Sequence, residues 1–481
     1  MKISLYEHVN HALVKQALDG DVNFTHLFDF DELVRSLLVR GYKDRRGNKY
    51  NCFHVSKHAD RIELKADYYI GIDWLIKGHK YVHVQPKLNK YVVEQFKAKS
   101  DTEEDVLIDV DPEQHEELKK EENQVHINYI KMLLDAMSDP IVAKECADLV
   151  RIEWEDDTIK IEQQDDSLTP FLVVQFLQLL RQIVRKGLKK SYYKVRENLN
   201  NRIKGKILVS QQIKQNVLKN RFTKTYCEYQ VFGEDNDENQ FLKKVFRFVT
   251  AYISNHQRFF LGNQKILDEL ANYIRPSFEH IGDLEGEEVL RHFKYNPFFK
   301  EYNEAIKIGG YILKRFGYNV SRASENQSIE TPPFWIDMPR LFELYVYQKL
   351  LQANNHDTNK IKYQYSTYGN AIDILIKDGE NSIIIDAKYK LQYASSLVHQ
   401  DIRQVAGYAR LNKVRTELGM GDEDDRNIDC LIIYPNLNNT SIVPKEFKLS
   451  SISQNMEQIQ GYYKVNKIGI SMPIFNAKFL K

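Results

Sequence analysis

The sequence predicts an α+β protein with several domains: a β-rich N-terminal region, a mainly helical middle region and a C-terminal α/β domain. Short runs of β-branched and aromatic residues dominate the first part, and helical periodicity follows from about residue 126. The last part alternates helices with strands. A chain of 481 residues is long enough for about three domains. We expect them to span 1–125, 126–335 and 336–481.

Composition narrows the class of protein. Hydrophobic residues make up 42% and charged residues 28%, which is typical of a folded globular chain. Because 68 Lys and Arg face 67 Asp and Glu, the net charge is +1, and any contact with DNA must use a local basic patch. The four cysteines lie far apart, which excludes a zinc ribbon and argues against a disulfide framework.

The expected location is the cytoplasm. The first eight residues lack the apolar core of a signal peptide. The sequence also has no apolar run near the roughly 18 residues that span a bilayer, so we expect no membrane contact.

The N-terminal region should be β-rich after a short helical lead. Residues 68–73 and 81–86 read as strands, and Gly78-His79 is a turn between them. The stretch near 96–125 is acidic with few apolar anchors, which indicates a solvated linker or insertion.

The middle region contains one clear buried helix. Ser167 to Pro170 has a hydroxyl cap and an early proline, residues 171–184 are heavily apolar, and Arg185-Lys186-Gly187 is a typical helix end. The basic stretch 186–207 follows, with Tyr192 and Tyr193. Such a stretch either grips phosphates and stacks on bases, or is a solvated helix end followed by a strand.

A hairpin in the C-terminal region carries the chemistry. After a helix at about 338–351, two β-branched runs at 371–376 and 382–388 flank an Asp-Gly turn. Pairing that is symmetrical about the Gly379–Glu380 bond places Asp373 opposite Asp386, with Cβ atoms roughly 5 Å apart. Lys388 then lies on the same strand face as Asp386.

Two carboxylates and a lysine at one point fit Mg²⁺-dependent phosphodiester hydrolysis. A bound Mg²⁺ polarises the scissile phosphate and lowers the pKa of an attacking water. Lys388 can orient the water or neutralise developing charge, and the Ala387 carbonyl can supply another ligand. The alternative is a surface hairpin with solvated ends. We favour the functional interpretation because Asp386 closes a run of three isoleucines that is typical of a buried strand.

Helical spacing adds two candidates. Glu343 shares a helical face with Val346 and Tyr347, where a carboxylate needs a partner or a metal. If Glu343 lies at the edge of that face, an ion pair with an arginine would satisfy its carboxylate equally well. In a helix expected near 401–411, Gln404 and Tyr408 point the same way, although a core-edge pair explains that spacing too.

These residues resemble the core of PD-(D/E)xK nucleases, whose restriction-endonuclease-like fold we therefore expect for 336–481. The resemblance rests on Glu343, Asp373 and Asp386-Ala387-Lys388. Gln404 and Tyr408 are similar to the motif that follows the core in the RecB-like branch. One departure is that Ile372 replaces the usual proline before Asp373. The resemblance implies catalytic roles for Glu343, Asp373, Asp386, Lys388 and Gln404, and metal ligation by Glu343, Asp373, Asp386 and Ala387.

The similarity extends to the McrC family over most of the chain. It is carried by Met338 to Val346, Asp386 to Lys390, Thr169 to Leu172, Lys186 to Leu188 with Tyr192, Lys204 to Ile207, Tyr69 to Gly71 and Gln85 to Leu88. The family implies the nuclease subunit of a McrBC-type, modification-dependent restriction system against phage. It also implies a hetero-oligomeric complex with a GTP-hydrolysing AAA+ motor that this subunit stimulates, with the N-terminal region binding the partner, and double-stranded DNA as substrate.

The sequence agrees on one point independently of the resemblance, because it contains no GxxxxGK[ST] phosphate loop. If the reaction needs nucleotide hydrolysis, another chain must perform it. Two alternatives stay open: a scaffold that activates a motor NTPase with little or no DNA cutting, and a standalone nuclease. The intact acid–acid–lysine set argues against the first, and the long region ahead of residue 336 argues against the second.

Overall fold

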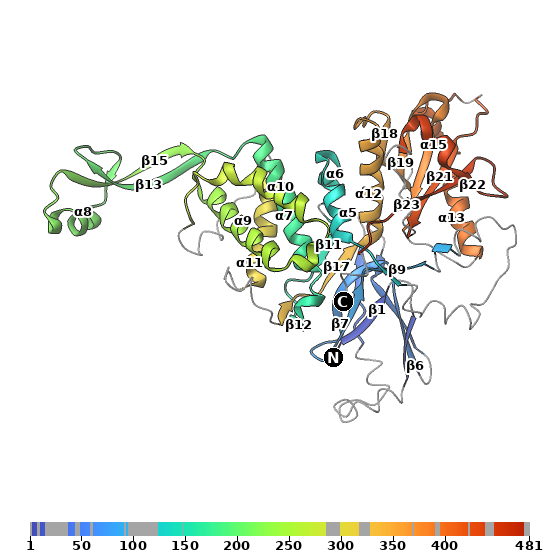
Figure 1. Cartoon of the computed structure of the whole chain (residues 1–481), viewed down its shortest axis with the longest axis horizontal. Helices are drawn as coiled ribbons and strands as arrows, with labels where there is room; N and C mark the ends of the chain where they lie inside the picture. Colours follow the sequence, from blue (N-terminus) through green and yellow to red (C-terminus); the bar gives the residue numbers. More distant parts are fainter. Residues whose placement is uncertain are drawn as a thin grey trace. The chain divides into compact units, whose positions relative to one another are not determined.

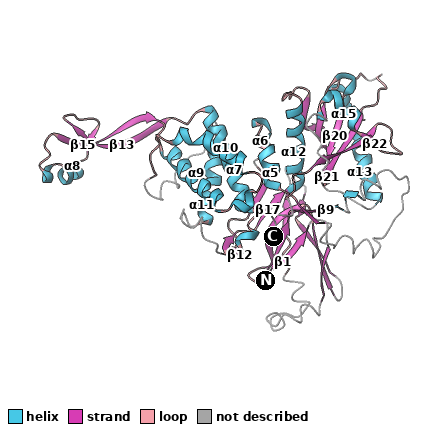
Figure 2. Ribbon diagram, in the orientation of Figure 1, coloured by secondary structure: helices cyan, strands magenta, loops and turns pink. Residues whose placement is uncertain are grey.

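The computed structural model describes residues 2–6, 10–14, 37–43, 49–57, 61–90, 93–94, 124–146, 148–284, 299–316, 328–367, 370–389, 395–421, 424–437 and 447–475. Over these ranges the chain contains eleven α-helices and several β-sheets, so it is a mixed α/β protein (Figures 1 and 2). It divides into two compact units, Met1–Leu168 with Ser328–Lys481, and Thr169–Gln327. The three predicted domains stay a prediction. Their last boundary, between residues 335 and 336, falls within a strand of the first unit.

A five-stranded sheet forms the N-terminal core of the first unit. Its order is β1 (Lys2–Tyr6), β8 (Lys80–Gln85), β7 (Tyr69–Ile76), β17 (Phe334–Asp337) and β11 (Val150–Ile152). The predicted strands and the turn at Gly78-His79 are confirmed as β7 and β8. Lys2–Tyr6 is a strand parallel to β8, so the expected helical lead is wrong for these residues.

Gly71 makes the pairing of β7 with β17 possible. It lies opposite Trp335, and a Cβ atom at this position would be 2.0 Å from the carbonyl oxygen of Phe334. A side chain here would push the strands apart, so the glycine is required by close backbone approach.

Short strands complete this part of the unit. They form a sheet of β2 (Asn10–Val14), β6 (Arg61–Ala66) and β5 (Phe53–Lys57), and three strand pairs: β3 (Gly41–Lys43) with β4 (Lys49–Asn51), β9 (Lys87–Asn89) with β10 (Gln124–His126), and β12 (Ile159–Ile161) with β16 (Ile329–Thr331). The acidic stretch near 96–125 lies outside the described residues except for its last two positions.

A buried carboxylate joins the first unit across its sheet. Asp73 on β7 is 0% exposed and accepts hydrogen bonds from Arg40 Nε at 2.9 Å and from Trp335 Nε1 at 3.1 Å. Its own neighbour contributes a third bond, from the Trp74 amide at 2.7 Å. Burial raises the pKa of Asp73, and Arg40 and Trp335 oppose that rise. These three donors offset part of the cost of burying the carboxylate.

The C-terminal part of the same unit is built on a six-stranded sheet. Its order is β18 (Ile361–Thr367), β19 (Asn370–Ile376), β20 (Ile383–Ala387), β21 (Asp429–Asn436), β23 (Val465–Ser471) and β22 (Glu457–Gln458). The first three strands are antiparallel, whereas β20, β21 and β23 run parallel. The predicted helix–strand alternation is confirmed here.

Helices cover this sheet. α12 (Met338–Ala353) follows β17 directly and stacks Tyr347 on Tyr363 of β18, with ring centroids 5.0 Å apart. α5 (Tyr129–Ala136) and α6 (Pro140–Glu145) pack on α12, where Lys349 Nζ lies 2.9 Å from Asp135 Oδ2. α13 (Ser395–Tyr408) packs on β20 and β21, and α14 (Asn412–Glu417) and α15 (Leu449–Asn455) follow it along the chain.

The second unit is a helical bundle that carries a long hairpin. Its helices are α7 (Leu168–Lys186), α9 (Asp237–Asn255), α10 (Gln264–Ile274) and α11 (Lys300–Arg315). The buried helix predicted at 171–184 is confirmed as α7, which ends before Gly187 at φ +89°. The basic stretch 186–207 begins at this helix end and continues as strand β13.

The hairpin, which we call the arm, projects from this bundle (Figure 1). β13 (Ser191–Asn200) pairs with β15 (Lys224–Gly233), and β14 (Lys206–Ile207) and α8 (Val209–Gln215) lie at its tip. Reciprocal amide hydrogen bonds of 2.8 and 2.9 Å between Asn198 and Asn216 tie the tip to the strands. The tip exposes several large apolar side chains: Ile203, Val209, Leu218 and Phe222.

Asp73 gives a stability prediction. Asp73→Ala should lower the free energy of unfolding by about 3 kcal/mol, the lower end of the range for a broken buried ion pair, because Arg40 keeps a second partner in Asp156. Chemical denaturation measures the change. The control is Asp157→Ala, whose exposed carboxylate lies 3.2 Å from Lys77 Nζ and should contribute less than about 1 kcal/mol. Equal effects of the two substitutions would contradict the assignment.

Candidate metal and catalytic site

The hairpin that carries the acidic residues has the predicted register. Ile374, Leu375 and Ile376 of β19 pair with Ile385, Ile384 and Ile383 of β20. Continuing this register by one residue places Asp373 opposite Asp386, as predicted. The connection is longer than a two-residue turn, since Gly379–Asn381 form a short 3-10 helix.

Burial of both faces of the hairpin specifies this register. All six isoleucine and leucine side chains in these pairs are at most 1% exposed, so both faces of the hairpin are buried. A one-residue slip would turn these side chains to the opposite faces and break their packing.

Asp373 reaches across to the neighbouring strand. Its Oδ2 accepts a hydrogen bond from the Ala387 backbone amide at 2.9 Å. This contact brings Asp373 to the end of β20, where Asp386, Ala387 and Lys388 follow one another. Three of the predicted site residues therefore meet Asp373 at the carboxyl end of β20, an interior strand of the sheet.

Asp386 closes the buried strand and is only 6% exposed. Its Oδ2 atom is buried and receives no hydrogen bond from the described part of the chain, although Lys388 Nζ lies 3.2 Å away. Burial raises the pKa of Asp386, Lys388 opposes the rise and Asp401 adds to it. Such an oxygen fits a site that is completed by a cation.

Lys388 lies between two carboxylates. Its Nζ atom is 3.2 Å from Asp386 Oδ2 and 3.3 Å from Asp401 Oδ1 of α13. Burial by itself lowers the pKa of Lys388, but the attraction of Asp386, Asp401 and Asp373 outweighs burial and leaves the pKa raised. The lysine is therefore a permanent positive charge beside the acidic pair.

Glu343 approaches the same point from α12. Its Oε2 accepts a hydrogen bond from Gln364 Nε2 at 3.0 Å. Burial raises the pKa of Glu343 well above its ordinary value, and the negative charges of Asp373, Asp337 and Asp386 raise it further. The negative charges of Asp373 and Asp386 therefore reach Glu343.

Gln404 and Tyr408 share one face of α13, as the spacing predicts. Gln404 Nε2 donates a hydrogen bond to Tyr408 Oη at 2.8 Å. Burial raises the pKa of Tyr408, and Asp386 and Asp373 contribute to the rise, so Tyr408 lies within the field of the acidic pair. The exposed Gln404 contacts this group through Tyr408.

Sequence patterns missed three residues that hold the site. Asp401 binds Lys388, Gln364 binds Glu343, and Arg340 lowers the pKa of Glu343 by its positive charge. Arg340 lies one turn ahead of Glu343 on the same helix, so the three-residue spacing was a usable signal. Asp401 and Gln364 come from other elements, and nothing in their local sequence marks them.

The residues fit a divalent cation by their chemistry. Asp373, Asp386 and Glu343 supply hard carboxylate oxygens, and one buried oxygen of Asp386 has no hydrogen bond. Within the described ranges no three His, Cys, Asp or Glu residues already form a metal-binding group. A cation would thus draw the carboxylates together and offset the repulsion that raises the pKa of Glu343.

The described part of the chain contains no helix that is both long and apolar enough to cross a membrane. The four cysteines are buried and form no disulfide. Fold and site define a mixed α/β protein with an acidic, lysine-containing cluster at the carboxyl end of an interior strand, β20.

Comparison with known proteins gives the family. The family model for the McrBC 5-methylcytosine restriction system component matches residues 64–418, which is more than half of the chain. The chain belongs to this family, and the resemblance found in the sequence is confirmed at this level. No curated protein matches the chain.

Two solved structures are similar over most of the chain. One is a refined half-complex from a tetradecameric assembly of Thermococcus gammatolerans McrB AAA+ hexamers with bound McrC, with 13% identity, a TM-score of 0.34, and coverage of 98% of this chain and 94% of that chain. The other is a cryo-EM structure of the Thermococcus gammatolerans McrBC complex, with 15% identity, a TM-score of 0.29, and coverage of 85% and 99%.

The raised pKa of Glu343 gives a pH prediction. The folded chain holds a proton on Glu343 that the unfolded chain releases above its ordinary pKa of 4.5. Stability from this group is therefore complete below that pH and is lost as the pH rises toward the folded-state pKa. Without divalent cations, Glu343→Gln should raise the free energy of unfolding at neutral pH, by about 1.4 kcal/mol for each unit by which the pKa is raised.

Chemical denaturation in EDTA across the acid range measures this gain, which should shrink as the pH falls toward 4.5 and vanish well below that pH. Glu417→Gln is the control with the opposite sign, because a hydrogen bond from Lys362 lowers the pKa of Glu417. Glu417→Gln should lower the free energy of unfolding slightly at neutral pH and leave it unchanged in acid. A Glu343→Gln protein that is less stable at neutral pH would contradict the prediction.

Proposed function

We propose that this chain is the DNA endonuclease subunit of a McrBC-type restriction complex and hydrolyses phosphodiester bonds with Mg²⁺. The observation that carries the proposal is the meeting of Asp373 of β19 with Asp386 and Lys388 at the carboxyl end of β20, with Glu343 within their electrostatic reach. Membership of a restriction-system family supports the same conclusion. The C-terminal domain then has the PD-(D/E)xK fold.

Asp373, Asp386 and Glu343, with the Ala387 carbonyl, would hold the metal. A bound Mg²⁺ supplies Lewis-acid polarisation of the phosphate and a more acidic water. The chain's own contribution is placement: the β19–β20 register fixes both aspartates, and Gln364 orients Glu343. Lys388 presents a positive charge where negative charge develops on the phosphate.

The lysine suits this role because it stays charged. Three carboxylates surround it, and their attraction outweighs the cost of burial. A fixed charge that is present before the reaction needs no reorganisation in the transition state, which is the main source of electrostatic catalysis. Gln404, held by Tyr408 on α13, would assist at the edge of the same site.

The second part of the proposal is a partner. We infer that the chain binds and stimulates an AAA+ GTPase or other NTPase and works with it in a hetero-oligomeric complex in the cytoplasm. The sequence has no phosphate loop of its own, and the family is that of a restriction system with several components. The apolar side chains exposed at the tip of the arm support a docking role, since clustered exposed apolar surface marks interaction sites.

The alternative is a scaffold that activates the motor and does not cut. Nicking of supercoiled plasmid by the purified chain, with and without a co-purifying NTPase and with Mg²⁺ or EDTA, separates the two functions. Mg²⁺-dependent nicking supports the nuclease, and stimulated NTP hydrolysis without any nicking supports the scaffold.

Asp386→Ala gives the sharpest test of the site. It removes a proposed ligand from the end of a buried strand, so DNA cleavage should fall by at least about a hundredfold, the upper range for groups that orient a metal site. Folding and stimulation of the partner NTPase should be preserved. The matched control is Asp378→Ala in the same hairpin, which loses only the surface pair with Lys360 and should cut normally. Full cleavage by Asp386→Ala would refute the assignment.

Arg403 gives a test of DNA contact. It is exposed on α13, next to Gln404, and a net charge of +1 leaves DNA attraction to such local cations. Arg403→Ala should weaken binding to all DNA sequences alike and reduce the slope of log affinity against log salt by about one unit. Affinity at several salt concentrations measures the slope.

The control for this measurement is Arg426→Ala, because Arg426 is held by Asp424 with Nη2 2.6 Å from Oδ2. Its slope should not change. An unchanged slope for Arg403→Ala would mean that Arg403 makes only a surface ion pair, and an altered site preference would mean that it reads bases.

A further inference from the structure

Asp401 occupies a special place beside the acidic site. It lies on α13, outside the β19–β20 hairpin, and its Oδ1 atom is 3.3 Å from Lys388 Nζ. The same ammonium is 3.2 Å from Asp386 Oδ2. Lys388 is thus shared almost equally between a proposed metal ligand and a carboxylate from another element.

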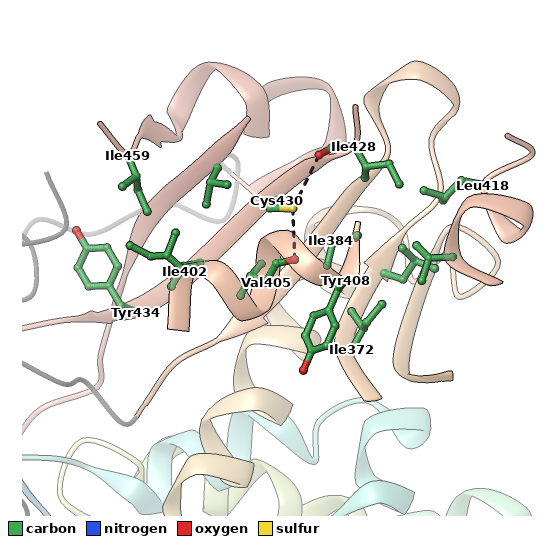
Figure 3. Packing of buried hydrophobic residues seen from close by; sticks show 14 residues of the cluster. Ile372, Ile384, Ile402, Val405, Tyr408, Leu418, Ile428, Cys430, Tyr434 and Ile459 are labelled. Atoms are coloured by element: carbon green, nitrogen blue, oxygen red, sulfur yellow. Dashed lines mark hydrogen bonds between the residues drawn. The ribbon is translucent and has the colours of Figure 1, made fainter. Parts of the chain in front are cut away.

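The position of Asp401 is fixed by the packing of α13 on the sheet. The next residue, Ile402, and Val405 are 0% exposed and join the core that includes Ile384 of β20 (Figure 3). The Val405 carbonyl also lies 3.6 Å from Cys430 Sγ on β21. Because one face of α13 packs on β20 and β21, the backbone of Asp401 is held beside the end of β20.

The sharing has a consequence for Asp386. Asp386 Oδ2 is buried, and the Lys388 ammonium lies 3.2 Å from it. An ammonium group has three donors, so Lys388 can serve both carboxylates at once. Its attraction to Asp386 is therefore divided with Asp401.

We infer that Asp401 is a positioning residue: it shares the Lys388 ammonium with Asp386, which weakens the hold of the lysine on Asp386 and leaves that carboxylate available to a divalent cation. The inference rests on the proposed function, because it assigns Asp386 to the metal. Without Asp401, the full attraction of Lys388 falls on Asp386, and the lysine competes more strongly with the cation for that carboxylate.

Binding of Mn²⁺ to the full chain, measured by isothermal titration calorimetry, tests this directly. Asp401→Asn should weaken Mn²⁺ binding by about tenfold, the lower range for residues that support metal ligands. Lys388→Met should bind Mn²⁺ at least as tightly as the unmodified chain, because the competitor is gone. In the double variant, Asp401→Asn should cause no further change.

Three controls isolate the effect. Asp401→Glu keeps the charge beside Lys388 and should retain the unmodified affinity within about twofold, far from the loss expected of Asp401→Asn. Asp429→Asn removes a carboxylate on the neighbouring strand β21 that pairs with Lys464 at 3.5 Å, and should leave Mn²⁺ binding unchanged. In plasmid cleavage, Asp401→Asn should lower the rate at subsaturating Mg²⁺ and recover at high Mg²⁺, with the KM for DNA unchanged.

The outcomes separate the inference from the proposed function. If the unmodified chain cleaves DNA and binds Mn²⁺, and Asp401→Asn does both equally well, the inference is overturned. The proposed nuclease function is then still supported. An equal loss from Asp401→Asn with and without Lys388 would overturn it as well, since Asp401 would then act as a ligand itself. If Asp401→Asn does not fold, weaker Mn²⁺ binding by Lys388→Met alone would overturn it. Absence of both Mn²⁺ binding and cleavage in the unmodified chain would overturn the proposed function, and the inference with it.

Discussion

The site depends on one constraint, the register between β19 and β20. Three pairs of buried isoleucine and leucine side chains fix that register, and the aspartates follow at its end. Like charges opposite each other across a ladder are destabilising, typically by a fraction of a kcal/mol to about 1 kcal/mol per pair. Burying each large aliphatic side chain contributes roughly 1.5–3 kcal/mol. The apolar pairs therefore outweigh the repulsion, and the fold can hold carboxylates together before any cation arrives.

The parts of the site that lie close in sequence could be predicted, and the parts that depend on tertiary packing could not. Asp373, Asp386 and Lys388 belong to one hairpin, so strand alternation and turn symmetry were enough to place them. Glu343 was suggested by its helical face, but only the fold brings α12 to the hairpin. Asp401 and Gln364 were not predicted, because their partners lie on other elements and a single Asp or Gln has no local pattern that reveals a distant contact.

The fold shows the same division. Strands β7 and β8 and helices α7 and α12 were predicted from composition and periodicity. The pairing of β7 with β17 was not, because about 260 residues separate them and no local signal records which strands become neighbours. The parallel pairing of Lys2–Tyr6 with β8 is another long-range choice, and here a short helical lead was expected instead of a strand.

The long-range pairing of β17 links the N-terminal sheet to the site. Trp335 on β17 donates its indole N–H to the buried Asp73, and two residues later Asp337 caps α12 by accepting from the Arg340 amide at 3.0 Å. Glu343 follows six residues after that cap, about 9 Å along the helix axis. Because the strand and the helix share one continuous backbone, the direction in which α12 leaves the sheet sets where Glu343 lies. A residue as distant in sequence as Asp73 therefore belongs to the support of the acidic site, although it does not touch it.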